Sequence, residues 1–198
     1  MATKTRMSAE ERREQVLDAA MALVAQRGFD ATPTLAIAEA AGISHAYLFR
    51  LFGSKEELAV ALVARCNALV HARFEHAATA ARARGEDPGI AMGTAYSELL
   101  LDRDVVLVQL HAYAASPTHP EIRAAMRESF RDLVAVVQDP GGLPEDEVRP
   151  FFATGMLMNV AVALGLPEVD EPFARTLTSK DGEDLLPGTP CAAPERPA

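Results

Sequence analysis

Features that would identify an enzyme or a secreted protein are scarce in this sequence. The 198 residues include two cysteines and no tryptophan, and aromatic side chains make up only 6%. Cys66 and Cys191 lie far apart and form no pattern of metal ligands, which indicates a cytoplasmic chain without disulfides. The sequence has no nucleophile elbow, phosphate-binding glycine loop or paired-cysteine motif. We therefore expect a protein that is not an enzyme, with no catalytic residues, no cofactor and no metal.

Long apolar runs are also missing. No run reaches the ~18 apolar residues that a membrane helix needs, and the amino terminus lacks the apolar core of a signal peptide. Hydrophobic residues still make up 49% of the chain, enough for a substantial core. Few aromatics, many alanines and no sustained strand-like alternation predict an all-α protein that does not contact a membrane.

Positive charge is in short supply, since the net charge of the chain is −9. The distribution is uneven: residues 1–55 hold seven basic and six acidic side chains, a net charge of +1, which leaves −10 for the remainder. An acidic body with a nearly neutral end suits a protein that contacts DNA through that end only. Bulk attraction to DNA would then be weak, and specific contacts would matter more.

The most specific pattern in the sequence lies over residues 33–52. Its apolar spacing predicts two short helices, with Gly42 ending the first and Ser44 capping the second. We expect Thr32 to cap the first helix, with Pro33 at its first helical position. The pattern predicts a helix-turn-helix, whose second helix enters the major groove of DNA.

Two capping boxes flank this pattern. Ser8 with Glu11 opens an amphipathic helix that Gly28 ends, and Ser54 with Glu57 opens a long helix. One helix, a helix-turn-helix and a capped exit helix make a complete three-helix DNA-binding head.

The same residues resemble the amino-terminal domain of TetR-type transcriptional repressors. The similarity spans about residues 10–70 and rests on the order Arg12-Arg13, Ala19-Ala20, Gly28-Phe29, Thr32, Ile37-Ala38, Ala41-Gly42-Ile43-Ser44, Phe52 and Ser54-Lys55-Glu56. Two positions depart from the family pattern. Phe49 stands where tyrosine is usual, which removes a phosphate hydrogen bond. Thr34 stands where an apolar residue is more common, and we expect Leu35 to replace it in the packing.

The resemblance implies a homodimeric regulator that binds a palindromic operator in double-stranded DNA. The residues expected to contact DNA are Thr32, Ser44, His45, Ala46, Tyr47, Arg50 and Lys55. Among them, the matching family positions favour phosphate contact for Thr32 and Lys55. In the first turn of the recognition helix, His45 can bond to a base or phosphate, and Ala46 is small enough for a thymine methyl group. Tyr47 can donate its hydroxyl to a phosphate.

Glycine and proline clusters divide the rest of the chain. They predict helices over residues 55–84, 90–101, 104–115, 121–138 and 144–164, with a short helix over 172–177. The DNA-binding domain would cover residues 10–70, and a helical regulatory and dimerisation domain would cover 71–178. Residues 179–198 are rich in proline, glycine and charge, which predicts a disordered tail.

Methionine and aromatic side chains occur on several helices of the body, where such residues ordinarily form a core. The resemblance implies a small-molecule pocket among them, and a flexible lining of this kind suits an apolar ligand. The candidate ligand-binding residues are Phe74, Met92, Tyr96, His111, Met126, Phe130 and Met156. Small residues in 151–164 permit close helix contact, so this helix and the one over 121–138 form the expected dimer surface.

Two other classes of function share much of this composition. The chain would fit a helical small-molecule enzyme that merely contains a similar hairpin, or a protein-interaction module. His71 and Glu75 are four residues apart on one helix, but two ligands do not make a metal site. The complete head with its capping boxes favours a transcriptional repressor that a small apolar ligand releases from its operator.

Overall fold

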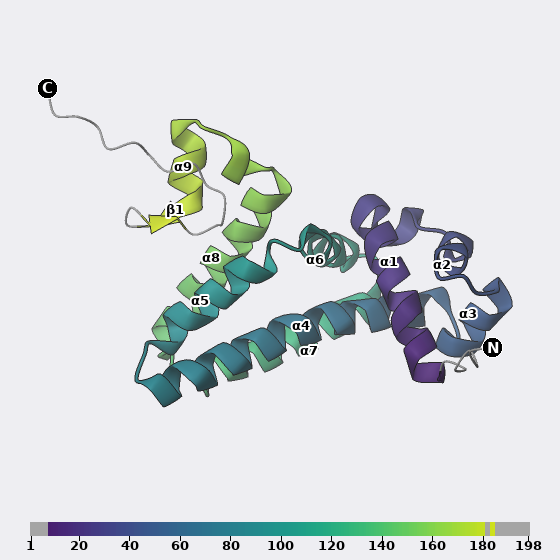
Figure 1. The fold of residues 1–198 in the computed structure, drawn as a ribbon, viewed down its shortest axis with the longest axis horizontal. Coiled ribbons are helices and arrows are strands. Elements are labelled where there is room, and N and C mark those ends of the chain that lie inside the picture. The colour runs from purple at the N-terminus through teal and green to yellow at the C-terminus, as the bar shows by residue number, and fades with distance from the viewer. Residues whose placement is uncertain (1–7, 181–182, 185–198) are drawn as a thin grey trace, which may run out of the picture. The chain divides into compact units, whose positions relative to one another are not determined.

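The protein is predominantly helical, as the sequence predicts (Figure 1). The computed structural model describes residues 8–180 and 183–184. Its elements are α1 (Ala9–Ala31), α2 (Thr34–Ala40), α3 (His45–Phe52), α4 (Lys55–Arg84), α5 (Pro88–Leu99), α6 (Arg103–Ala115), α7 (Pro120–Gln138), α8 (Glu145–Ala163), the 3-10 turn η1 (Leu166–Glu168), α9 (Pro172–Thr178), β1 (Ser179–Lys180) and β2 (Glu183–Asp184). Within the described ranges, no helix is both long and apolar enough to cross a membrane.

The carboxyl-terminal end differs in one detail from the expected tail. Ser179 pairs with Asp184 and Lys180 with Glu183 in a two-stranded antiparallel ladder. These four residues fall in the segment for which the composition predicts disorder. The rest of that segment, residues 181–182 and 185–198, lies outside the part of the chain that the structure describes.

The chain divides into two compact units. The first joins the described residues up to Asn67 with Leu107–Ser129, and the second joins Ala68–Val106 with the described residues from Phe130 onward. Helices α4, α6 and α7 therefore each contribute residues to both units. The first unit holds the predicted DNA-binding head together with a much later segment, a grouping that sequence patterns do not reveal.

The capping box of α1 is formed as predicted. The backbone N–H of Glu11 donates to Oγ of Ser8 at 3.1 Å, and the backbone N–H of Ser8 donates to the Glu11 carboxylate at 2.6 Å. Val16 and Ala20 are fully buried on the inner face of the helix. Gly28 breaks the helix with a φ of +78°, and a short helical continuation then runs to Ala31.

Two histidines attach the segment 107–129 to the end of α1 within the first unit. Nε2 of His111 lies 3.2 Å from the carbonyl oxygen of Ala25. Nε2 of His119 lies 3.0 Å from a carboxylate oxygen of Asp30. These contacts explain why this segment groups with the head.

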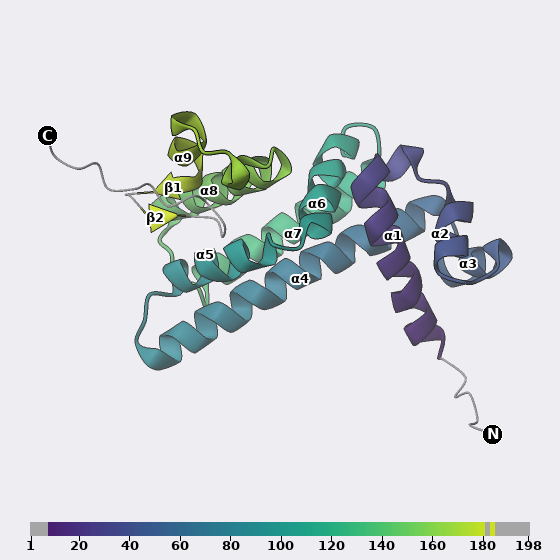
Figure 2. The same ribbon diagram turned by 45° about the horizontal axis from the view of Figure 1, so that its top comes forward.

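In the second unit, α5 lies alongside the carboxyl-terminal half of α4 (Figure 2). An aromatic cluster forms its core: the Phe74 ring meets those of Tyr96 and Phe151 edge to face, with centroids 5.7 and 5.6 Å apart. The hydroxyl of Tyr96 donates to Oδ1 of Asn159 at 2.8 Å, and both residues are buried. This polar pair is thus enclosed in the core of the second unit.

Candidate nucleic-acid interface

The turn between α2 and α3 is built as the sequence predicts. Gly42 has a φ of +64°, a conformation that glycine adopts without a Cβ penalty. Its backbone N–H donates to the carbonyl of Glu39, and that of Ile43 donates to the carbonyl of Ala38, both at 3.0 Å. These two bonds satisfy two of the last four carbonyls of α2. Ala38 is fully buried, which lets α2 and α3 approach closely.

The start of α2 corrects three expectations. Thr32 does not cap the helix, because its hydroxyl donates to the carbonyl of Gly28 at 2.6 Å and the residue is only 1% exposed. Pro33 occupies the cap position without a side-chain hydrogen bond, and the helix begins at Thr34. Leu35 does not join the packing either, since it is 52% exposed. The Thr32 hydroxyl therefore faces the interior of the first unit.

Arg13 of α1 fixes the carboxyl end of α3. Its Nη1 donates to the carbonyl of Leu51 at 2.9 Å, and its guanidinium carbon lies 4.2 Å from the centroid of the Phe52 ring. The bond satisfies a carbonyl that the end of the helix leaves without a partner. Arg13 was singled out in the sequence only through the family resemblance, and no local pattern indicates this contact.

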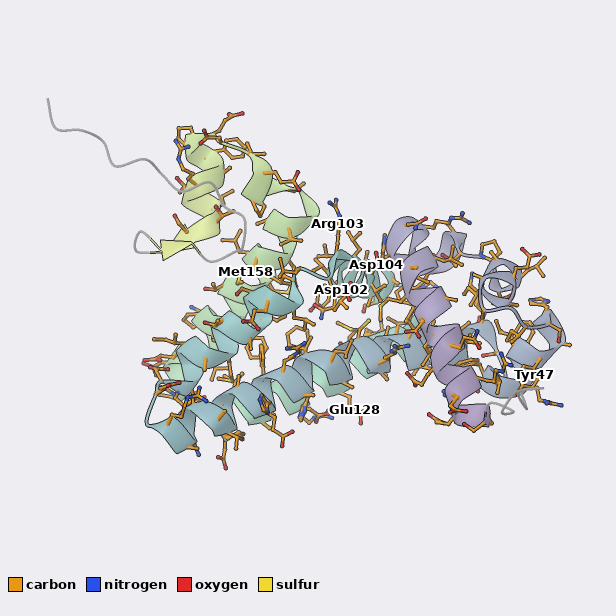
Figure 3. The ribbon with its side chains drawn as sticks, in the orientation of Figure 1. Tyr47, Asp102, Arg103, Asp104, Glu128 and Met158 are labelled. Carbon is orange, nitrogen blue, oxygen red and sulfur yellow. The ribbon has the colours of Figure 1, made fainter. Side chains whose placement is uncertain are left out.

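The outer face of α3 carries most of the expected DNA-contacting residues. Oγ of Ser44 accepts the backbone N–H of Tyr47 at 3.2 Å, so Ser44 caps α3 as predicted. His45, Ala46 and Arg50 are exposed, and Tyr47 is half-buried at the outer edge of the first unit (Figure 3). The guanidinium carbon of Arg50 lies 4.6 Å from the Tyr47 ring centroid, which holds both side chains on one surface.

Lys55 begins α4 next to this surface. Its ammonium donates to the carbonyl of Asp30 at 3.0 Å, which engages one of its three protons. Oγ of Ser54 accepts the backbone N–H of Glu57 at 3.0 Å and caps the helix. The pKa of the Glu56 carboxyl is held below its usual value, because the carboxylate accepts from its own backbone N–H and from the Ser54 hydroxyl.

The seven candidate ligand residues are not all brought together. Phe74, Met92, Tyr96, Phe130 and Met156 belong to the second unit, whereas His111 and Met126 belong to the first. Met126 is buried there, with its sulfur 3.8 Å from Nδ2 of Asn67.

A separate open groove of about 620 Å³ lies on the second unit between α4 and α5, and includes His76, Arg84 and Ile90. None of the candidate ligand residues lines it.

Comparison with known proteins agrees with this geometry. Residues 16–62 match the family described as bacterial regulatory proteins, tetR family. Over 52 residues the chain is 44% identical to the uncharacterized HTH-type transcriptional regulator YvkB of Bacillus subtilis (strain 168). That match covers 26% of this chain and only 28% of the length of YvkB.

Solved structures share the fold over most of the chain. A TetR-family member from Streptomyces coelicolor A3 is 25% identical, with a TM-score of 0.68 over 85% of this chain and 96% of that one. The regulator FadR from Bacillus subtilis, solved in complex with stearoyl-CoA, is 17% identical, with a TM-score of 0.59 over 83% of this chain and 92% of that one. The helix-turn-helix, the sequence match across it and the shared fold lead to one assignment: residues 16–62 form a DNA-binding domain of the tetR type found in bacterial regulatory proteins.

Proposed function

We propose that this chain is a cytoplasmic, homodimeric transcriptional repressor that binds a palindromic operator and is released from it by a small apolar ligand. The observation that carries the proposal is the recognition helix α3. Its inner residues Leu48 and Phe52 are buried, while the first turn on its other side is exposed. A helix held in this way can enter the major groove without rearrangement of the unit that supports it.

The contacts with DNA would divide between bases and backbone. His45 and Ala46 are exposed in the first turn of α3, where base edges are read. Tyr47, Arg50 and Lys55 would contact phosphates and set the position of the head on the duplex. Ser44 would contribute through the helix start it caps. Thr32 takes no part through its side chain, because its buried hydroxyl already donates to a carbonyl.

A binding-site selection from a random duplex library tests this proposal, followed by fluorescence anisotropy on the selected duplex. Lys55→Ala should weaken binding to all duplexes and lower the salt slope by about one unit. Tyr47→Ala should cost about 1–3 kcal/mol on the selected duplex. Arg149→Ala, which removes a charge from the second unit, serves as the control and should change neither quantity. Unchanged affinity and salt slope in both head variants would refute the assignment of the surface.

Dimerisation is supported by an apolar stripe on α8. Leu157, Val160 and Leu164 recur at spacings of three and four residues and are 39%, 42% and 67% exposed. Such spacing places them on one helix face, and a contiguous exposed apolar face is typical of a protein interface. On α9, which contacts α8, Phe173 and Leu177 are 51% and 38% exposed and extend the apolar surface.

This surface refines the dimer interface expected from the sequence. On α7 the exposed positions include Arg127, Glu128, Arg131 and Asp132, so we propose that α8 pairs with α9 rather than with α7 at the interface. One recognition helix covers only a few base pairs, and a two-fold dimer would place two of them about one DNA turn, ~34 Å, apart or somewhat more.

Sedimentation of a charge-inserting variant tests the interface. Val160→Glu should convert the dimer to a monomer, because it places a carboxylate within the apolar stripe. Ile90→Glu is the matched control: Ile90 is 71% exposed on α5 and is not part of the stripe, so its replacement should leave the dimer intact. A dimer that tolerates Val160→Glu would exclude this face.

Ligand control is supported by the core of the second unit and by the length of α4. The aromatic and methionine side chains around Phe74, Met92 and Tyr96 can repack around an apolar molecule. The similar fold of a regulator solved with stearoyl-CoA supports an effector of apolar character. Because α4 contributes to both units, a ligand that shifts its second half would also act on the head.

Thermodynamic linkage supplies the test of ligand control. An effector must bind the DNA-incompetent state more tightly, and the operator must weaken effector binding by the same factor, for a coupling of about 1–3 kcal/mol. A thermal-shift screen of apolar compounds would find binders, and each binder would be titrated against the complex with the selected duplex. Binders that stabilise the protein but never release the duplex would contradict ligand control while leaving DNA binding intact.

A further inference from the structure

His45, exposed at the start of the recognition helix, makes two contacts that orient its ring. Its Nε2 lies 2.8 Å from Oγ1 of Thr34, the first residue of α2. One helical turn further along α3, the Phe49 ring meets the imidazole edge on, with centroids 4.9 Å apart and an interplanar angle of 69°. Thr34 and Phe49 are the two positions at which this sequence departs from the family pattern, and His45 contacts both.

The hydrogen bond to Thr34 selects one of two orientations of the imidazole. A half-turn about the Cβ–Cγ bond exchanges Nδ1 with Cδ2 and Nε2 with Cε1. Only one of the two orientations places a nitrogen against the Thr34 hydroxyl, which donates or accepts as the ring requires. The Phe49 ring restricts rotation from the side of the helix. Nδ1 of His45 therefore has a fixed place, and it is the ring nitrogen that Thr34 leaves for another partner.

We propose that Thr34 is a specificity-determining residue of the DNA interface. By holding Nε2 of His45, it presents Nδ1 to a hydrogen-bonding base edge in the major groove. Thr34 is a positioning residue, since it acts on the base through His45. This inference rests on the proposed function, because it requires α3 to lie in the groove.

The expected size of the effect follows from the number of orientations that Thr34 excludes. Two ring orientations and three staggered χ1 positions give about six states for a histidine without restraint. Loss of the Thr34 hydroxyl should therefore reduce discrimination at the base pair read by His45 by about two- to sixfold. Phosphate contacts do not depend on the ring of His45, so affinity for non-specific duplex should stay constant.

The experiment uses the full chain and duplexes selected from a random library. Single base-pair substitutions in the selected duplex, assayed with wild type and His45→Ala, identify the base pair that His45 reads. Thr34→Val should lose about two- to sixfold discrimination at that pair alone. Thr34→Ser, which keeps the hydroxyl, should restore it. Thr94→Val is the matched control, because Thr94 donates to the Ile90 carbonyl within α5 of the second unit.

The double variant Thr34→Val, His45→Ala should lose no more base-pair discrimination than His45→Ala alone, because Thr34 acts only through the His45 ring. Undiminished discrimination in Thr34→Val would overturn the inference, and so would an equal loss of affinity for every duplex. The latter would mean that Thr34 only supports the fold.

Nitrogen-15 spectra of the imidazole rings separate this inference from the proposed function. Thr34→Val should shift the ring nitrogen signals of His45, and Thr34→Ser should return them toward wild type. Unchanged His45 signals in Thr34→Val would overturn the contact itself, whatever DNA the chain binds. Failure of the library to yield any enriched duplex would instead refute the proposed function, and with it the recognition of a base by His45.

Discussion

Replacement of Arg13 by alanine should loosen the carboxyl end of the recognition helix. The guanidinium donates to the Leu51 carbonyl at 2.9 Å and lies 4.2 Å from the Phe52 ring centroid. A charged hydrogen bond at a half-exposed site stabilises by about 1–1.5 kcal/mol, and a cation–π contact there by about 0.5–1 kcal/mol. Loss of both should therefore cost about 2 kcal/mol. For a chain of this size that corresponds to a fall of about 4–8 °C in Tm, measured by far-UV circular dichroism.

The neighbouring arginine supplies the control for Arg13→Ala. Arg12 donates to Oε1 of Gln15 at 2.9 Å, three residues along the same helix, and such a surface pair contributes less than about 0.5 kcal/mol. The Tm of Arg13→Lys should lie between those of Arg12→Ala and Arg13→Ala, because an ammonium keeps the charge but lacks the planar group that stacks on Phe52. Equal midpoints for Arg12→Ala and Arg13→Ala in urea unfolding would refute the role assigned to Arg13.

Two further predictions concern the two units separately. Gly28→Ala should destabilise the protein by about 1–3 kcal/mol, which is more than Gly42→Ala should cost. Both glycines have positive φ, but a Cβ at Gly28 would lie 3.2 Å from Nδ1 of His111, whereas a Cβ at Gly42 would meet no atom within 4 Å. Urea unfolding of both variants checks this order, and equal costs would contradict it. Tyr96→Phe and Asn159→Ala should be non-additive by about 0.5–3 kcal/mol, because they remove the same buried hydrogen bond of 2.8 Å. A double-mutant cycle by thermal unfolding measures this coupling, and simple addition of the two costs would show that the pair is not coupled.

Local chemistry made much of the fold predictable. The caps at Ser8, Ser44 and Ser54 depend on residues within three positions of each other, and all three were predicted correctly. The Gly42 turn depends on the freedom of glycine to adopt positive φ, again a local property. The boundaries of α4, Lys55–Arg84, agree with the predicted range of 55–84 because the Ser54 cap and the Gly85 break define its ends.

The candidate interface was predictable in part. His45, Ala46 and Arg50 lie on the exposed face of α3, as helical periodicity requires. Thr32 was assigned wrongly as a cap, because its sequence position fits either a cap or a buried hydroxyl. The choice depends on the carbonyl of Gly28, which the break in α1 places 2.6 Å from the Thr32 hydroxyl.

Periodicity, capping and one short motif are local properties of the chain, and they were enough to specify the helices, their ends and the TetR-type head. The contacts between residues far apart in the chain became known from the three-dimensional fold. It joined Leu107–Ser129 to the head through His111 and His119, placed Arg13 against the end of α3, and set Thr34 against His45. It also divided the candidate ligand residues between two units. Such contacts depend on how helix faces pack against one another in three dimensions, and spacing along the chain does not encode that packing locally.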